Sequence, residues 1–220
     1  MLLSLGAAAL CVAAPRASAA KDYPDLRYVS LTFDDGPHPT LTPMLLDMLE
    51  RERVRATFYM IGSSAAGSPD IVRRAFEAGH EIGNHSWSHP DLTRIPLTRA
   101  AEEIARTDAQ LESITGEKPS TVRPPYGALN SQVEALAEPR PMMLWDVDTN
   151  DWRTRNTASV EHAAIRSDGG IVLMHDIHPT TVAAVPAIIR DFKSRGFRFV
   201  TISDCVEWDI RNTADWLDLA

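Results

Sequence analysis

Two histidines four positions apart, His85 and His89, carry the side chains in this sequence best suited to bind a metal ion. At this spacing, side chains on a helical turn lie on one face, so both imidazoles can reach one cation. Two imidazoles and a carboxylate leave coordination positions open for water and a substrate, as catalytic zinc sites require. Taken alone, a pair with this spacing more often has a structural role. With an acidic partner it predicts a divalent metal centre, for which zinc suits the ligands and cobalt is the alternative.

Adjacent carboxylates, Asp34 and Asp35, follow the apolar and β-branched run 27–33 and precede the turn residues Gly36 and Pro37. This pattern places them where a strand ends. Because neighbouring strand residues point to opposite faces, we expect the two acids to have different tasks. A solvated turn is the alternative for so short a pattern in isolation.

His175 directly follows the continuous apolar run 171–174, which predicts a strand buried on both faces. An imidazole at the end of such a strand can act as an acid or base near neutral pH. The alternative is a core histidine that is hydrogen-bonded to backbone.

Strand and helix patterns alternate along the chain, which predicts an α/β fold with a parallel sheet and outer helices. Polar clusters containing Asp34, His85, Arg123, Asp148 and His175 each follow an apolar run. The carboxyl ends of the strands share one mouth in a β/α barrel, so we predict a barrel with the chemistry at that mouth. A flat doubly wound sheet is the alternative, but its ligands gather at one switch point. We predict the strands at 27–33, 56–61, 80–82, 141–144, 171–174 and 197–202, with helices between them including 98–115 and 181–195.

Composition is that of one globular domain, with 220 residues, 44% hydrophobic and 24% charged. A formal charge of −8 without a basic cluster excludes nucleic acid as an expected partner.

Residues 1–19 form a short apolar stretch ending in Ala17-Ser18-Ala19, which predicts a secretory signal peptide, an extracellular location and a mature domain over 20–220. The stretch is too short to span a membrane, so no transmembrane segment is expected after signal removal. Cys205 then stands alone without an internal disulfide, and we expect a monomer.

Five motifs together resemble those of the polysaccharide deacetylases, carbohydrate esterase family 4, whose catalytic unit is called the NodB homology domain. The motifs appear in the family's order and cover most of the chain between about residues 27 and 202. They are Thr32-Phe33-Asp34-Asp35-Gly36-Pro37, His85-Ser86-Trp87-Ser88-His89, Arg123-Pro124-Pro125-Tyr126-Gly127, Asp148-Thr149-Asn150-Asp151-Trp152 and Ile171-Val172-Leu173-Met174-His175. The resemblance implies a distorted (β/α) barrel with about seven parallel strands.

The resemblance also implies a role for each motif residue. Asp35, His85 and His89 would hold the divalent metal. Asp34 would be the general base, which Arg123 would orient and keep ionised, and His175 would be the general acid. Asp151 would support His175, in preference to Asp148. Tyr126 would offer its backbone N–H to the oxyanion, and Trp152 and Leu173 would line the pocket for the acetyl methyl group.

By this resemblance the chain is expected to be a secreted, metal-dependent N-deacetylase of β-1,4-linked amino sugars. Peptidoglycan is the preferred substrate, ahead of chitooligosaccharide. The same site could instead remove O-acetyl groups from acetylated xylan, because an alcohol leaves more easily than an amine. A catalytically silent carbohydrate-binding protein is the third alternative, although no catalytic motif residue is missing.

Overall fold

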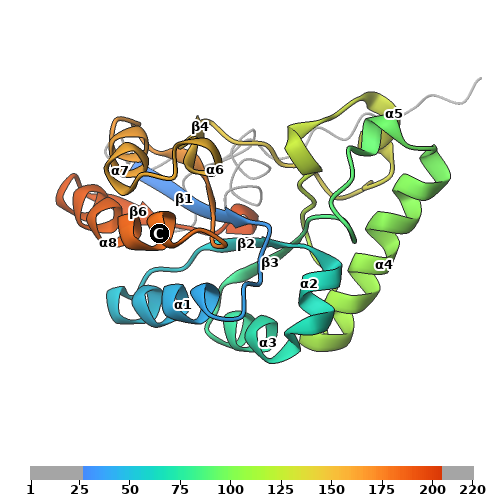
Figure 1. Cartoon of the computed structure of the whole chain (residues 1–220), viewed down its shortest axis with the longest axis horizontal. Helices are drawn as coiled ribbons and strands as arrows, with labels where there is room; N and C mark the ends of the chain where they lie inside the picture. The colour runs from blue at the N-terminus through green and yellow to red at the C-terminus, as the bar shows by residue number, and fades with distance from the viewer. Residues whose placement is uncertain (1–26, 205–220) are drawn as a thin grey trace, which may run out of the picture.

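A computed structural model describes residues 27–204, where six strands form one parallel sheet (Figure 1). The strand order is β3-β2-β1-β5-β4, with β6 beside β1. The strands are β1 (Arg27–Asp34), β2 (Thr57–Met60), β3 (Glu81–Asn84), β4 (Val147–Asp148), β5 (Gly170–His175) and β6 (Phe197–Phe199). The predicted signal peptide, residues 1–19, lies outside the described residues.

Helices surround the sheet, with α1 and α3 on one side and α6 and α7 on the other (Figure 1). Local sequence fixes their ends: Pro69 begins α3, and Gly116 ends α4 at a φ of 82°. The helices are α1 (Leu41–Glu52), α2 (Gly62–Gly67), α3 (Pro69–Glu77), α4 (Leu97–Thr115), α5 (Ser131–Ala135), α6 (Asp151–Thr154), α7 (Thr157–Ile165) and α8 (Pro179–Ser194), with 3-10 turns at Leu92–Arg94 and Pro125–Gly127.

The main hydrophobic core lies where the helices pack on the sheet. Leu31 and Phe33 of β1, Phe58 of β2 and Met174 of β5 are all buried, and Ile188 of α8 packs into the same cluster. Because helices cover this parallel sheet, its central strands are buried along most of their length, including residues 29–34 of β1 and the whole of β2. This packing confirms the parallel α/β class with outer helices.

One predicted strand is wrong. Residues 141–144 form no regular strand, and Met142 makes only a single bridge to Val122. The carbonyls of Met143 and Leu144 accept hydrogen bonds from the Arg123 side chain, so they do not extend a ladder. The strand comes later, as β4 (Val147–Asp148). The described residues contain six strands, against the about seven that the family resemblance implied.

Within residues 27–204, no helix has both the length and the apolar character needed to cross a bilayer. At the carboxyl edge of the sheet, β1 ends at Asp34, β3 ends directly before His85, and β5 ends at His175. The sheet thus brings chemically active residues from three strands to one edge.

Candidate active site

The carboxylate of Asp35 lies between two imidazoles. Its Oδ1 atom is 3.4 Å from His85 Nε2 and 3.2 Å from His89 Nε2, and one ligand atom from each of the three residues lies within 4.8 Å of the others. Burial alone would raise the pKa of Asp35, but when the two facing imidazoles are protonated their hydrogen bonds and positive charge outweigh burial and hold it far below its usual range. The three side chains are therefore placed to share one cation.

The histidines converge through a loop, not the helical turn that their spacing suggested. Residues 85–89 follow β3 without helical structure, and Ser86 and His89 have left-handed φ values of 62° and 61°. The chain bends between them, at residues 87–88, and the imidazole rings end 5.0 Å apart between their centroids.

The hydrogen bonding of this cluster fits a divalent metal. His85 Nδ1 is 2.7 Å from the carbonyl oxygen of Arg123, which can only accept, so Nδ1 carries the proton and Nε2 presents its lone pair. Asp35 Oδ1 is buried and makes no hydrogen bond within the described part of the chain. Lone pairs that converge without a proton between them repel one another, and a cation relieves that repulsion. Two imidazoles and one carboxylate match a catalytic zinc ligand set.

Asp34 meets a different environment, although it is adjacent to Asp35. Its side chain is almost fully buried, and its Oδ1 atom accepts a 2.8 Å hydrogen bond from the equally buried guanidinium of Arg123. Arg123 also donates to the hydroxyl of Thr32 at 2.8 Å. Asp34 Oδ2 is 3.7 Å from His85 Nε2, so this carboxylate is fixed beside the prospective metal ligands.

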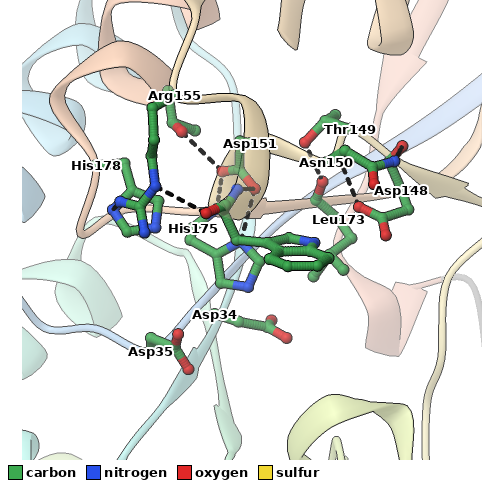
Figure 2. A network of polar contacts seen from close by, with 12 residues as sticks. Asp34, Asp35, Asp148, Thr149, Asn150, Asp151, Arg155, Leu173, His175 and His178 are labelled. Carbon is green, nitrogen blue, oxygen red and sulfur yellow. Dashed lines mark hydrogen bonds and ion pairs between the residues drawn. The ribbon is translucent and has the colours of Figure 1, made fainter.

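A second histidine–carboxylate pair faces this cluster, and Figure 2 shows the His175 ring between Asp151 and the two aspartates. His175 Nδ1 is 2.7 Å from Asp151 Oδ1, and Asp151 Oδ2 accepts from the His175 backbone N–H and the Thr181 hydroxyl. Burial would lower the pKa of His175, but Asp151 and the charges of Asp34 and Asp35 raise it to about 9. His175 is therefore cationic near neutral pH and can donate a proton.

Of the two acids Asp148 and Asp151, only Asp151 contacts His175 in the described structure. Asp148 Oδ1 instead accepts from the backbone N–H of Asn150 at 2.7 Å (Figure 2). The opposite charge of His175 lowers the pKa of Asp151, against the effect of its burial. Asp151 is thus the acid in contact with His175, and its role as support for a general acid stays a prediction.

These groups line a pocket of about 430 Å³. Leu173 is buried in its wall, whereas the rings of Trp152 and Tyr126 are exposed at its rim. Tyr126 has a φ of 61°, a value that bulky residues rarely adopt, and its ring lies 4.6 Å from that of His89. The lining residues are Asp34, Asp35, His85, His89, Tyr126, Trp145, Asp148, Trp152, Leu173 and His175.

Sequence reasoning missed several supporting residues. Thr32 belongs to the first motif but was given no role, and Thr181 lies outside all five motifs. They contact Arg123 and Asp151 respectively, and no spacing signal predicts these contacts. Trp145 lines the pocket and lies two residues before β4, three residues ahead of the polar motif 148–152, so its position in the chain was an available signal.

Comparison with known proteins agrees with this geometry. A family model described as polysaccharide deacetylase matches residues 21–143. A peptidoglycan-N-acetylglucosamine deacetylase of Listeria monocytogenes is 45% identical over 178 residues, which cover 80% of this chain and 38% of that protein. A chitooligosaccharide deacetylase of a Bradyrhizobium species is 36% identical over 80% of this chain and 89% of its own length. This chain thus spans about two fifths of the Listeria relative and most of the Bradyrhizobium one.

A solved structure of a peptidoglycan deacetylase from Bacillus subtilis has the same fold. It superposes with a TM-score of 0.82 at 37% identity, covering 87% of this chain and 95% of that one. The agreement extends over nearly the whole described chain, as expected for the distorted barrel.

Proposed function

The chain belongs to the polysaccharide deacetylase family, and from that premise we propose that it is a metal-dependent hydrolase of N-acetyl groups on β-1,4-linked amino sugars. One observation carries the proposal: prospective metal ligands, an arginine-paired aspartate and an aspartate-backed histidine meet at one pocket. Acyl transfer from an amide needs a polarised carbonyl, a base and an acid, and this pocket contains a candidate for each.

Asp35, His85 and His89 would hold the metal, with zinc as the proposed ion and cobalt as the alternative. When bound there, the ion supplies Lewis acidity toward the acetyl carbonyl and a water molecule. Asp34, fixed by Arg123, would accept a proton from the attacking water molecule as the water oxygen bonds to the carbonyl carbon. The backbone N–H of Tyr126 is the proposed donor to the oxygen that gains charge.

His175 would complete the reaction as general acid. An amine is a poor leaving group until it is protonated, so His175 delivers a proton to the sugar nitrogen as the C–N bond breaks. The products are acetate and a free amino sugar. Asp151 stabilises the imidazolium before the transfer, and Trp152 and Leu173 enclose the acetyl methyl group.

Peptidoglycan N-acetylglucosamine is the proposed substrate. The 45% identity to the Listeria relative of that activity supports it, and the Bradyrhizobium relative makes chitooligosaccharide the main competitor. We further propose that residues 1–19 are a signal peptide and that the protein is secreted. N-terminal sequencing of protein recovered from culture medium should begin at Ala20.

The function is tested by acetate release from peptidoglycan fragments, chitooligosaccharide and acetylated xylan in one buffer. We expect release from the first two, with a preference for peptidoglycan, and His175→Ala should lower amide turnover by about 10²- to 10⁴-fold. Bound metal should remain unchanged in this variant. Parallel loss of metal would make His175 a ligand, and release from xylan alone would make the protein an esterase. A lack of release from every glycan would favour a silent binding protein.

A further inference from the structure

A buried glutamate on α4 reaches the loop that carries the two histidines. Glu103 is 6% exposed, and its Oε2 accepts from the backbone N–H of Ser88 at 2.7 Å. Its Oε1 accepts from the Ser88 hydroxyl at 2.9 Å. The two carboxylate oxygens thus hold one residue, and that residue directly precedes His89.

We propose that Glu103 is a positioning residue for the metal centre, which fixes the loop so that His89 faces Asp35. The inference rests on the metal site of the proposed function. Glu103 itself contacts no metal ligand side chain; it acts through Ser88. Groups that orient metal ligands from behind typically change metal affinity about 10- to 100-fold when they are removed.

The loop needs such support because its conformation is not one that its residues prefer. Ser86 and His89 both have left-handed φ values, which residues with a side chain rarely adopt. At its start the loop is already held: the Ser86 and Trp87 carbonyls accept from the backbone N–H groups of Gly62 and Ser63 at 2.9 and 3.0 Å. At its end, Glu103 supplies the matching anchor.

The burial of the Glu103 carboxylate and its hydrogen-bond donors indicate that this residue serves to hold Ser88. Residues at helical spacing around it, Ala100, Ile104, Thr107 and Leu111, are buried, so Glu103 lies on the core side of α4. A buried carboxylate is costly unless hydrogen-bond donors satisfy it. Among the described residues, both donors to this carboxylate come from Ser88, and neither is a cation.

The preceding residue provides a matched control. Glu102 lies on the same helix but is exposed, and it pairs with Arg99 at 2.7 Å on the outer surface. Glu102→Ala removes the same number of atoms and the same charge as Glu103→Ala, without touching the loop. A long-range charge effect on metal binding would therefore appear in both variants, whereas loss of loop positioning would appear only in the second.

The experiment measures the Kd for Zn²⁺ by chelator competition, using metal-stripped full-length protein. We expect Glu103→Ala to weaken binding about 10- to 100-fold, and Glu103→Gln, which keeps one acceptor oxygen, to fall between it and the wild type. Glu102→Ala should match the wild type. With Co²⁺ bound, the visible spectrum of Glu103→Ala should also differ, because the ligand geometry changes.

Each outcome has a distinct meaning. A wild-type protein that binds neither Zn²⁺ nor Co²⁺ contradicts the proposed function itself. Tight wild-type binding with equal Kd values in Glu103→Ala and Glu102→Ala overturns the role of Glu103 and leaves the function standing. A lower melting temperature of metal-free Glu103→Ala with unchanged Kd also overturns it. If Glu103→Ala does not fold, the Kd for Zn²⁺ is measured in Ser88→Ala and Glu103→Gln instead. An unchanged Kd in both variants refutes the proposal.

Discussion

Asp34 and Asp35 are neighbours in sequence but have different partners: an arginine for Asp34 and two imidazoles for Asp35. Alternation along β1 directs Asp34 toward Arg123, and the left-handed φ of 74° at Asp35 aims that carboxylate at the imidazoles. The adjacency of two acids was enough to predict two different environments. It did not indicate which acid meets the arginine, because that depends on how Arg123, almost ninety positions later, folds back against β1.

At the same scale, Asp151 sets the protonation of His175. Asp151→Asn removes the charge that raises the pKa of His175 to about 9, so the pKa of His175 should fall. His175 acts as an acid only when protonated, and activity is therefore lost as pH rises through this pKa. In the variant, the alkaline limb of the pH–rate profile should move to lower pH, and turnover should fall roughly 10²-fold.

The measurement is kcat against pH with the same metal in both proteins, because a bound dication also disfavours the imidazolium. Asp148→Asn is the matched control: it makes the same chemical change at the acid that contacts Asn150. Its alkaline limb should stay at the wild-type position. An equal shift in both variants would refute the pairing of Asp151 with His175.

Among the elements, helices were easier to predict than short strands. The predicted helix 98–115 differs from α4 by one residue at its start, because its apolar spacing and Gly116 mark both the face and the end. The signal for Glu103 was also present, as an acid on the apolar side of that helix. The wrong strand prediction at 141–144 had a different cause. The Arg123 side chain donates hydrogen bonds to carbonyls that a neighbouring strand would otherwise pair with, and no local sequence pattern indicates that competition.

Adding a single carbon atom, the Cβ of an alanine at Gly83, should disturb the packing between β2 and β3. A Cβ on Gly83 would lie 2.4 Å from the buried ring of Tyr59, and the Arg123 guanidinium lies over that ring at 4.1 Å. Gly83→Ala must therefore displace Tyr59 and disturb Arg123. We expect a loss of about 1–3 kcal/mol in the free energy of unfolding, together with reduced turnover.

Urea unfolding of the metal-free protein measures this effect. Gly67→Ala is the control, because a Cβ there meets nothing within 4 Å, and alanine in α2 should be neutral or stabilising by up to about 1 kcal/mol. Equal unfolding midpoints for the two variants would show that the strand contact tolerates the added methyl group.

For the molecule as a whole, strand–helix alternation was enough to predict the parallel α/β class, and the family was recognised from five short motifs. Residues far apart in sequence, from Asp34 to His175, line one pocket because parallel strands deliver their ends to the same edge. The exact number of strands could not be predicted from the sequence, since edge segments near Val122 and Met142 pair at single positions only. Those pairings depend on the folded neighbours more than on local sequence.

The central claim is that one ion, held by Asp35, His85 and His89, enables hydrolysis in this pocket. Its most direct test is acetate release from peptidoglycan fragments while Zn²⁺ is titrated into metal-stripped protein. We predict no turnover without metal, a linear rise that ends at about one equivalent per chain, and no rise in His89→Ala, as expected for a single three-ligand site. Full turnover without metal, or an unchanged titration in His89→Ala, would contradict the account.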